Sequence, residues 1–538
     1  MQLCVRALRP LPSPFPPPIH PPATHAPPPP PPSRPLADNA LNGIPTCASP
    51  FLRDLLRGTW AFKGYVTSDT GALEDIYNQH HFTATEAEAA CQALVNGTTD
   101  VSSDVVYHNA LLTCAKAGID AALTNTFRLR FQLGLFDPIG DQPYWATPLS
   151  AVATPAAAAT NLLATLSSMV LLKHDGKTLP LPVGKTIAVV GPHANATDAL
   201  VGNYLAQLCA DDTSHCVQSP FQAIAARNAG GVTRLAKGPG LTKNDTKGWA
   251  EALAEAAAAD VVVLVLGIDG SIEGESNDRT SIDLPAVQHA FAAAVGALGK
   301  PTALVLVHGG SLDTAAERDS AAIGAVVDAF YPGTRGSEAI AATLFGANDH
   351  LGGKMAFTTY PSAYTDAIQM SEMELDVGPG RSYRFYTGET VYDFGHGLSL
   401  TTFSLALASG PASGALPTEA GAPSANLTYT VTVTNTGAVA GDEVVQAYFL
   451  PQATPSQPKS KLRKQLFDYQ RVHLAPGAQA QVSFTVNSAT LRLVDRDSGD
   501  SVSTPGRFDV LFTNGVDQSL HNPVTVSGAE VRVAAFPF

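Results

Sequence analysis

Gly64-Tyr65-Val66-Thr67-Ser68-Asp69-Thr70-Gly71 is the most informative stretch of this 538-residue sequence. Apolar and β-branched residues lead to a carboxylate and then to glycine, which is typical of a buried parallel strand whose last residue points into a cleft. In a (β/α) barrel, carboxylates at the C-terminal ends of strands are the usual catalytic positions. The competing interpretation is that Asp69 caps the helix that follows.

The bulk composition narrows the classes of protein to which the chain can belong. Its length predicts two to four domains, and charged residues make up only 15% of it with a mean hydropathy of +0.06. The net charge of −14 and the pI near 5.4 argue against nucleic acid or an anionic membrane as a partner. No apolar run approaches the roughly 18 residues of a membrane helix. These properties suit a soluble protein that acts on a neutral substrate.

Cysteine and histidine give no sign of a metal site. None of the six cysteines forms a C-x-x-C pair, so neither a zinc motif nor a redox motif is present. Cys209 and Cys216 are close enough in sequence to clip a surface loop. His80 and His81 are neighbours, but adjacent residues on a strand point to opposite faces, and no third ligand is suitably spaced. We expect no metal and no cofactor.

The N-terminal segment 1–36 is dominated by proline. Residues 1–35 hold 15 of the 41 prolines, a composition that cannot form a packed core and predicts extended or disordered chain. Proline also interrupts any apolar region of a signal peptide, so this chain shows no export signal. We interpret the segment as foreign to the fold that follows it.

Residues 37–138 are predicted to be the C-terminal part of a (β/α) barrel. Strands are expected at 64–69 and, more briefly, at 98–101. A capping box at Thr85-Glu-Ala-Glu88 opens a helix that stops at Asn96-Gly97. A second helix is expected over 119–133, with an apolar stripe formed by Ile119, Leu123, Phe127 and Phe131. About two strand–helix units cannot close an eight-stranded barrel.

Residues 166–365, after a linker at 139–165, are predicted to be an α/β domain. Apolar strands alternate with alanine-rich helical stretches, which indicates a mostly parallel sheet covered on both faces. The sequence contains neither G-x-G-x-x-G nor G-x-x-x-x-G-K-[ST], which argues against a nucleotide site. The strands are expected at 169–172, 186–190, 260–266, 302–307 and 325–329, and helices at 249–258 and 286–298.

The rest of the chain is predicted to be a connector at 366–400 followed by an all-β domain at 401–538. Apolar residues and threonines alternate over 427–434, which predicts a half-buried strand. Further strands are expected at 443–450, 481–486 and 507–512, between turn signals such as Pro476-Gly477 and Asn514-Gly515. Short strands joined by such turns favour a β-sandwich.

Several of these motifs together resemble glycoside hydrolase family three, in its β-xylosidase-like branch. The likeness runs from about residue 37 to the C-terminus and includes segments 39–45, 60–69, 133–138, 191–195, 202–204 and 331–333. It implies a barrel, an α/β sandwich and a fibronectin-type-III-like β-sandwich. In that family the carboxylate of the Gly-Tyr-x-x-Ser-Asp motif is the nucleophile of a retaining glycosidase, which implies this role for Asp69. Family members begin with a nearly complete barrel, and the likeness in this chain starts at the part that corresponds to the end of that barrel.

A retaining glycosidase needs a second carboxyl group as acid/base. The candidate stretch, residues 267–279, follows the most apolar strand of the α/β domain, where a loop at a C-terminal sheet edge is expected. In xylosidase-like members a glutamate lies a few residues before an Asp-Arg pair, and Glu275 precedes Asp278-Arg279 by three. The family usually has glycine after that glutamate, but Ser276 follows here, so Glu273 is the alternative. A solvated acidic loop is the non-catalytic interpretation.

The resemblance implies an exo-acting β-glycoside hydrolase that retains configuration and removes xylose from xylo-oligosaccharides, as in xylan catabolism. β-Glucosidase and α-arabinofuranosidase activities are the alternatives. A further alternative is a catalytically dead carbohydrate-binding fragment, because the family's sugar-binding residues lie mostly in the part of the barrel that precedes the nucleophile. The expected partner is a glycoside or oligosaccharide, and the family implies an extracellular protein.

Overall fold

The computed structural model describes residues 39–205, 208–209, 213–242, 245–275, 277–415, 426–452 and 461–536. The Pro-rich segment 1–36 lies outside the described residues. The chain divides into two compact units, the first containing residues 1–152 with 535–538 and the second residues 153–534. The predicted linker at 139–165 spans this boundary, and it contains most of a helix, α5 (Pro155–Ser168).

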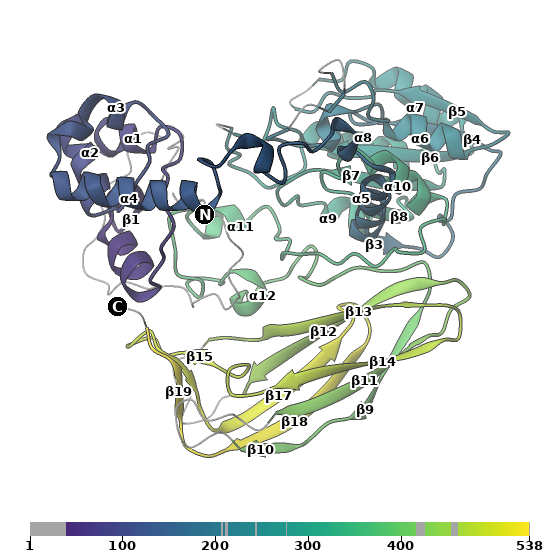
Figure 1. Ribbon diagram of the computed structural model, residues 1–538. Coiled ribbons are helices and arrows are strands. Elements are labelled where there is room, and N and C mark those ends of the chain that lie inside the picture. The colour runs from purple at the N-terminus through teal and green to yellow at the C-terminus, as the bar shows by residue number, and fades with distance from the viewer. Residues whose placement is uncertain are drawn as a thin grey trace. The chain divides into compact units, whose positions relative to one another are not determined.

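The first unit is helical (Figure 1). It contains a short hairpin, β1 (Ala40–Leu41) and β2 (Ile44–Pro45), and a π-helical segment at Leu52–Thr59. Its core combines larger apolar side chains such as Leu73 and Ile76 with the small side chains of Ala89, Ala90 and Ala93, which let the helices approach closely. The α-helices are α1 (Ala72–Asn78), α2 (Glu86–Val95), α3 (Val106–Ala110) and α4 (Lys116–Gln132).

The two segments predicted as barrel strands form only one parallel bridge, between Thr67 and Val101. Its hydrogen bonds run from the Ser68 N–H to the Val101 carbonyl, 2.9 Å, and from the Asp100 N–H to the Val66 carbonyl, 2.8 Å. The prediction of a regular strand at 64–69 is therefore wrong. An apolar run becomes a strand only where neighbours pair along it, and the described chain pairs this run at a single point.

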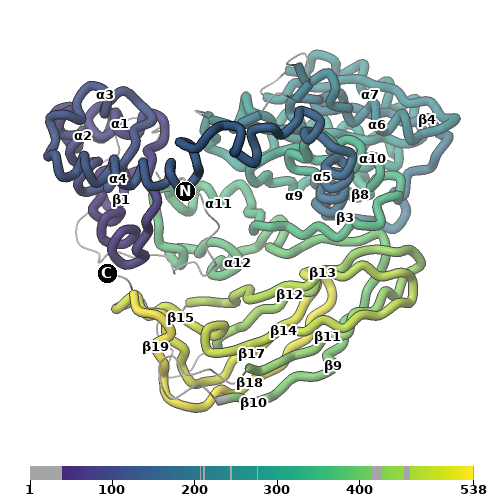
Figure 2. Tube along the Cα trace, viewed as in Figure 1, coloured from purple at the N-terminus to yellow at the C-terminus, as the bar shows by residue number. Residues whose placement is uncertain are grey.

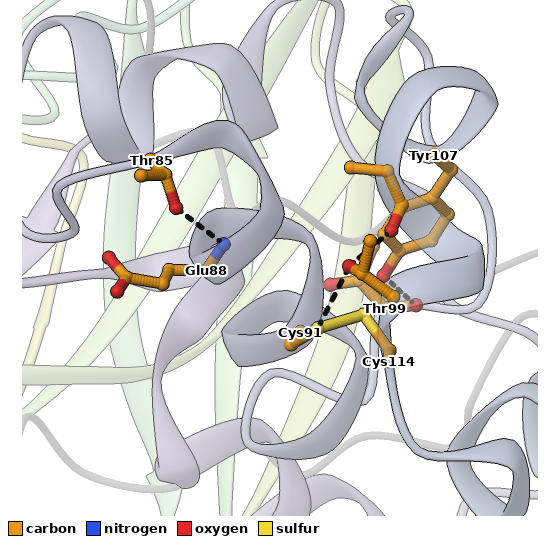
Figure 3. Close-up of a disulfide and its surroundings, with 8 residues drawn as sticks. Thr85, Glu88, Cys91, Thr99, Tyr107 and Cys114 are labelled. Carbon is orange, nitrogen blue, oxygen red and sulfur yellow. Dashed lines mark hydrogen bonds between the residues drawn. A yellow bond between two sulfur atoms is a disulfide. The ribbon is translucent and has the colours of Figure 1, made fainter.

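The helix predicted from the capping box is confirmed as α2. The Thr85 hydroxyl accepts a hydrogen bond from the Glu88 N–H, 3.2 Å, while the Glu88 carboxylate accepts one from the Ala84 N–H, 2.9 Å. A disulfide that the sequence did not indicate, Cys91–Cys114, ties this helix to the segment after α3 (Figure 3). The predicted Cys209–Cys216 clip is confirmed.

The predicted second helix is confirmed as α4, but its expected buried face is wrong. Leu123, Phe127 and Phe131 are 48%, 41% and 65% exposed, and the buried positions are Ala122 and Thr126. Hydrophobic periodicity shows which face a helix could bury, whereas the neighbouring elements determine which face it does bury. The Phe131 ring instead packs on Phe136, with centroids 4.4 Å apart.

The α/β domain contains a six-stranded sheet in the order β3-β8-β7-β6-β4-β5. All neighbouring pairs are parallel except β3–β8. The expected strands are confirmed, whereas β5, a half-exposed edge strand, was missed. The strands are β3 (Val170–His174), β4 (Thr186–Val190), β5 (Val232–Ala236), β6 (Val261–Gly267), β7 (Thr302–Val307) and β8 (Ala325–Asp328).

Helices cover both faces of this sheet, as Figure 1 shows. Because successive strand residues point to opposite faces, Ile187 and Val189 of β4 join one hydrophobic core while Ala188 and Val190 join the other. This double burial explains the uninterrupted apolar runs in the sequence. The helices are α5, α6 (Pro220–Arg227), α7 (Trp249–Ala258), α8 (Ala286–Gly296), α9 (Ala315–Asp319) and α10 (Gly336–Leu344).

The chain order of the strands reverses between β4 and β6. From β4 the chain moves outward to β5 and then crosses back to β6 on the other side of β4. Such a reversal leaves a crevice at the carboxyl ends of the two strands, where open α/β sheets bind ligands. Gly191 and Gly267, with φ of +123° and +142°, end these strands, and a Cβ at either position would collide with the neighbouring strand's backbone.

One stretch, Leu149–Ser168, is long and apolar enough to be compatible with a membrane span by length and composition alone. The expectation that no apolar run approaches that length is therefore corrected. The stretch reaches a mean hydropathy of 1.3 through alanine and leucine without charged residues. Two of its side chains, Thr165 and Leu166, pack into the α/β domain.

The β-sandwich follows a connector that includes α11 (Tyr364–Ala367) and α12 (Ser382–Phe385). Its larger sheet has the order β10-β18-β17-β12-β13, its smaller one β14-β11-β9, and a third short sheet is β15-β16-β19 (Figure 2). The alternation predicted for 427–434 is confirmed, because Tyr429, Val431 and Val433 point into the core. The strands are β9 (Phe403–Ser409), β10 (Ser413–Ala415), β11 (Leu427–Asn435), β12 (Gly441–Pro451), β13 (Gln465–Leu474), β14 (Gln479–Val486), β15 (Leu493–Val494), β16 (Ser501–Ser503), β17 (Gly506–Thr513), β18 (Ser519–Ser527) and β19 (Val531–Ala534).

A histidine on α8 lies between two carboxylates, one of which belongs to α9. The His289 ring nitrogens lie 2.7 Å from the Glu317 carboxylate and 3.1 Å from that of Asp283. Burial acts to lower the pKa of His289, but the hydrogen bonds and charges of Glu317 and Asp283 outweigh it and raise the pKa to about 9. The imidazolium is therefore favoured in the folded state.

We expect His289→Gln to destabilise the chain near neutral pH and not at pH 10. The stabilisation from a raised pKa is complete below the unfolded pKa of about 6.5 and is lost as pH rises through about 9. A loss of about 1–3 kcal/mol at pH 6 should lower the midpoint of thermal unfolding by a few degrees. The exposed His215→Gln is the control, and a deficit independent of pH would contradict the assignment.

Candidate active site

Asp69 lies at the end of the paired segment, on an exposed turn before α1. Its Oδ1 accepts a hydrogen bond from the N–H of Thr70, 2.8 Å, and it reaches no further into the helix. Two N–H groups in the first turn of α1 are bonded by Asp104, whose Oδ2 accepts from Leu73 at 3.0 Å and Glu74 at 3.3 Å. The Asp69 side chain is therefore not the cap of α1, and its second carboxylate oxygen makes no hydrogen bond with the described residues.

A network behind this segment fixes its backbone. The Asp100 carboxylate accepts a hydrogen bond from the Val66 N–H, 2.7 Å, one from the Asn125 side chain, 3.1 Å, and an ion pair from Arg57, 2.5 Å. Arg57 also donates to the Gly64 carbonyl. Burial dominates and raises the pKa of Asp100, although all three partners act to lower it. These residues, which sequence reasoning did not identify as partners of the motif, position Asp69 without touching it.

The second candidate carboxylate lies in the loop that follows β6. Asp269 starts this loop, and its Oδ1 accepts hydrogen bonds from the Ser271 N–H, 2.9 Å, and the Ser271 hydroxyl, 2.6 Å. The carbonyl of Asp269 accepts the Glu273 N–H at 3.0 Å. The start of the loop is thus a closed turn, and the carboxylates beyond it have defined positions relative to the sheet edge.

Glu273 is engaged in a structural ion pair. Its Oε2 contacts the Arg279 Nε, and the same guanidinium donates to the Ser311 carbonyl at 2.9 Å. The carboxylate packs against Gly310, where any side chain would clash with it. A glutamate held in this way is poorly suited to exchange protons with a substrate.

Glu275 occupies a different position in the same loop. Gly274 and Asn277 exchange both backbone hydrogen bonds, at 3.1 and 3.0 Å, so Glu275 lies in the tight turn between them. The Asn277 side chain stabilises the turn by donating hydrogen bonds to the carbonyls of Gly270, 3.1 Å, and Ser271, 3.2 Å. Glu275 is exposed, and no described residue bonds its carboxylate. Of the two glutamates, it is the one available for proton transfer.

His308 and Asp328 form a buried pair at the ends of β7 and β8, next to the loop that carries Glu273 and Glu275. The His308 ring lies 3.1 Å from the Asp328 carboxylate and 2.7 Å from the Gly310 carbonyl. Burial acts to lower the pKa of His308, but Asp328 and the Gly310 carbonyl outweigh it and raise the pKa. This bond fixes Gly310, the residue against which Glu273 packs.

Within the described part of the chain, one group of side chains has the spacing of metal ligands, namely His350, Asp442 and His473. Asp442 already accepts from Arg471 at 2.7 Å and lies 2.6 Å from the His473 ring. The fixed guanidinium charge opposes a divalent cation at this carboxylate. The group therefore has the character of an ion-pair network, which was not expected from the sequence. His81, which is not part of this group, has its ring Nδ1 3.1 Å from the Tyr77 carbonyl oxygen.

Family models match most of the second unit. The model described as "Glycosyl hydrolase family 3 C-terminal domain" matches residues 169–400, and the "Fibronectin type III-like domain" matches residues 443–515. The first corresponds to the α/β domain with the connector, and the second to the central strands of the sandwich. The predicted fold class is thereby confirmed for these two domains.

The similar proteins are glycosidases. The chain is 35% identical over 527 residues to a probable exo-1,4-beta-xylosidase of Aspergillus fumigatus, with 93% of this chain and 66% of the relative covered. It is also 35% identical to the exo-1,4-beta-xylosidase bxlB of Emericella nidulans, with 88% and 63% covered. The chain thus spans about two thirds of the length of the curated relatives it matches.

Solved structures agree with these relatives. A GH3 exo-beta-xylosidase in complex with a xylobiose aziridine activity-based probe superposes with a TM-score of 0.82 at 28% identity, covering 92% of this chain and 66% of that one. A beta-glucosidase of Listeria innocua in complex with glucose gives 0.78 at 25% identity, covering 91% and 67%. Two family models and relatives that align along nearly the whole chain lead to one conclusion: the chain belongs to glycoside hydrolase family 3.

Proposed function

We propose that this protein is a retaining exo-β-xylosidase that removes terminal xylose from xylo-oligosaccharides. The observation that carries the proposal is the 35% identity to exo-1,4-beta-xylosidases over 93% of the chain. The local geometry of the two carboxylates supports it, because the Asp69 side chain is not used as a helix cap and Glu275 makes no ion pair with the described residues. The disulfides Cys91–Cys114 and Cys209–Cys216 support action outside the cell.

The proposed chemistry follows the retaining double displacement. The Asp69 carboxylate attacks the anomeric carbon while the Glu275 carboxylic acid protonates the departing glycosidic oxygen. This step breaks the glycosidic bond and forms a xylosyl ester on Asp69. Glu275, now ionised, takes a proton from water, which attacks the same carbon and releases xylose from Asp69. Glu275 is thereby reprotonated, and the β-configuration is kept.

Proton NMR of a fresh xylobiose digest tests this proposal. The expected first product is β-xylose, which mutarotates only later, and the aryl β-xyloside should be cleaved faster than the aryl β-glucoside or α-arabinofuranoside. First release of α-xylose would contradict the retaining mechanism. Faster cleavage of the glucoside would favour the second candidate, a β-glucosidase, which the structural likeness to the Listeria innocua enzyme supports.

A non-catalytic carbohydrate-binding protein is the alternative of a different class. The chain spans about two thirds of its relatives, so their activity is carried over to it as a proposal. Absence of hydrolysis together with retained sugar binding in the purified chain would favour this alternative. Efficient hydrolysis that depends on Asp69 would exclude it.

A further inference from the structure

The loop that carries Glu275 is held against two residues that follow β7, Gly310 and Ser311. Gly310 lies so close to the Glu273 carboxylate that a Cβ there would collide with it. The Ser311 carbonyl accepts a hydrogen bond from Arg279 at 2.9 Å. Glu273 precedes Glu275 in the loop and Arg279 follows it. Both flanks of the Glu275 turn are therefore held by the same two residues, and all of these groups belong to the second unit of the chain.

The position of Gly310 is set in turn by a buried histidine. The Nδ1 of His308 lies 2.7 Å from the Gly310 carbonyl oxygen, and its Nε2 lies 3.1 Å from both carboxylate oxygens of Asp328. His308 and Asp328 are 2% and 1% exposed. They stand at the ends of β7 and β8, which pair in parallel. The Gly310 carbonyl is thus bonded to a support that cannot move independently of the sheet.

The partners of His308 fix its protonation state. A carbonyl oxygen only accepts, so the Nδ1 that faces Gly310 must carry a proton. The Oδ1 of Asp328 accepts the Phe330 N–H at 3.0 Å, which favours an ionised carboxylate that accepts a second proton bond from Nε2. Burial acts to lower the pKa of His308, but Asp328 and the Gly310 carbonyl outweigh it and raise the pKa. Asp328 therefore keeps the ring in a form that donates to Gly310.

We propose that His308, with Asp328 behind it, is a positioning residue for proton transfer by Glu275. The inference rests on the proposed function, which gives Glu275 the acid/base role. The His308 N–H fixes Gly310, and the segment from Gly310 to Ser311 fixes both flanks of the turn that presents Glu275. This relay depends on packing and on N–H bonds, and not on the charge of Glu273. A shift of about 1 Å in a catalytic group can cost on the order of 10²-fold in rate.

Two amide substitutions separate this role from a structural one. The side-chain N–H of asparagine lies near the place of the ring Nδ1, so His308→Asn can still donate to Gly310 but leaves Asp328 without its ion-pair partner. The amide of glutamine reaches the place of Nε2, so His308→Gln can still bond Asp328 but leaves the Gly310 carbonyl without this donor. Because a buried charge without its partner is the more costly defect, His308→Asn should be the less stable of the two.

The kinetic effects should have the opposite order. We expect His308→Gln to lower kcat/KM for xylobiose about 10- to 100-fold, because its departing sugar must be protonated. The value for an activated aryl xyloside, whose first step needs no proton donor, should change less than about 3-fold. His308→Asn should lose less on xylobiose despite its lower stability. A purely structural role predicts that the less stable variant is the more impaired one.

A second variant and a control lie outside the buried pair. Gly310→Ala pushes aside the ends of the Glu273 and Arg279 side chains, which can move at little cost to the fold. It should give the same pattern as His308→Gln even if the buried variants fail to fold. The matched control is His396→Asn, which removes a half-buried ring nitrogen that lies 2.9 Å from the Leu172 carbonyl in the same unit. It should change neither substrate relative to the other.

Amide hydrogen exchange of the full chain gives a readout that needs no activity. Peptides covering residues 268–282 should exchange faster in His308→Gln and in Gly310→Ala than in the unmodified chain, whereas peptides of the β-sandwich should not. Unchanged exchange in the loop overturns the inference, and so does an equal loss on both substrates or a loss that follows stability. If the unmodified chain hydrolyses neither substrate, the proposed function fails by itself, and the exchange measurement then decides whether His308 orders the Glu275 turn.

Discussion

Asp69→Asn is expected to abolish hydrolysis of an aryl β-xyloside, with a fall in kcat on the order of 10⁴-fold or more, as for the loss of other covalent nucleophiles. The amide is isosteric with the carboxylate and still accepts the Thr70 N–H bond at 2.8 Å, so the turn before α1 should keep its shape. The helix itself is capped by Asp104 and should be unaffected. A loss of hydrolysis in this variant would therefore reflect the missing nucleophile and not a change in folding.

Covalent labelling gives this prediction a second readout. A xylose-configured aziridine probe, of the kind bound in the similar exo-beta-xylosidase structure, should add its mass to the peptide that contains Asp69. Asp69→Asn should not be labelled, whereas Asp120→Asn, an exposed carboxylate on α4, should be labelled as well as the unmodified chain. Labelling at another carboxylate would contradict the assignment. A chain that neither hydrolyses nor labels would favour the carbohydrate-binding alternative.

The sequence predicted the α/β domain well because its strands are buried on both faces. An uninterrupted apolar run such as β7 has few other possible structures, and its bounds were predicted to the residue. The edge strand β5 contains Arg234 and alternates between exposed and half-buried positions, so its apolar signal is weak. The antiparallel direction of β3 was missed for another reason, since direction depends on the route of the chain and not on local composition.

The sequence offered candidate site residues but not their contacts. The motif around Asp69 singled out this carboxylate as a candidate, whereas Asp104, 31 positions from Leu73, shows that the Asp69 side chain is free of the capping role. Likewise, sequence spacing left Glu273 and Glu275 as competing candidates. Their difference lies in the ion pair with Arg279 and in the close approach of Gly310, which depend on how the loop packs against the end of β7.

Glu275→Gln is expected to lower kcat for xylobiose by about 10²–10⁴-fold, the usual contribution of a general acid. An aryl xyloside with an activated leaving group needs no protonation, so its first step should be much less affected and the xylosyl ester on Asp69 should accumulate. Azide attacks that ester without a general base, so it should restore turnover and yield β-xylosyl azide. The measurement is the rate on both substrates with and without azide, together with the azide product.

Glu273→Gln is the matched control, because it removes the neighbouring carboxylate from the same loop. Its expected effect is structural: Arg279 loses its ion-pair partner, the midpoint of thermal unfolding falls, and KM changes more than kcat. Azide should not rescue it, because the base that activates water is still present at Glu275. Rescue of Glu273→Gln and not of Glu275→Gln would reverse the two roles. It would also mean that the ion pair with Arg279 opens when substrate binds.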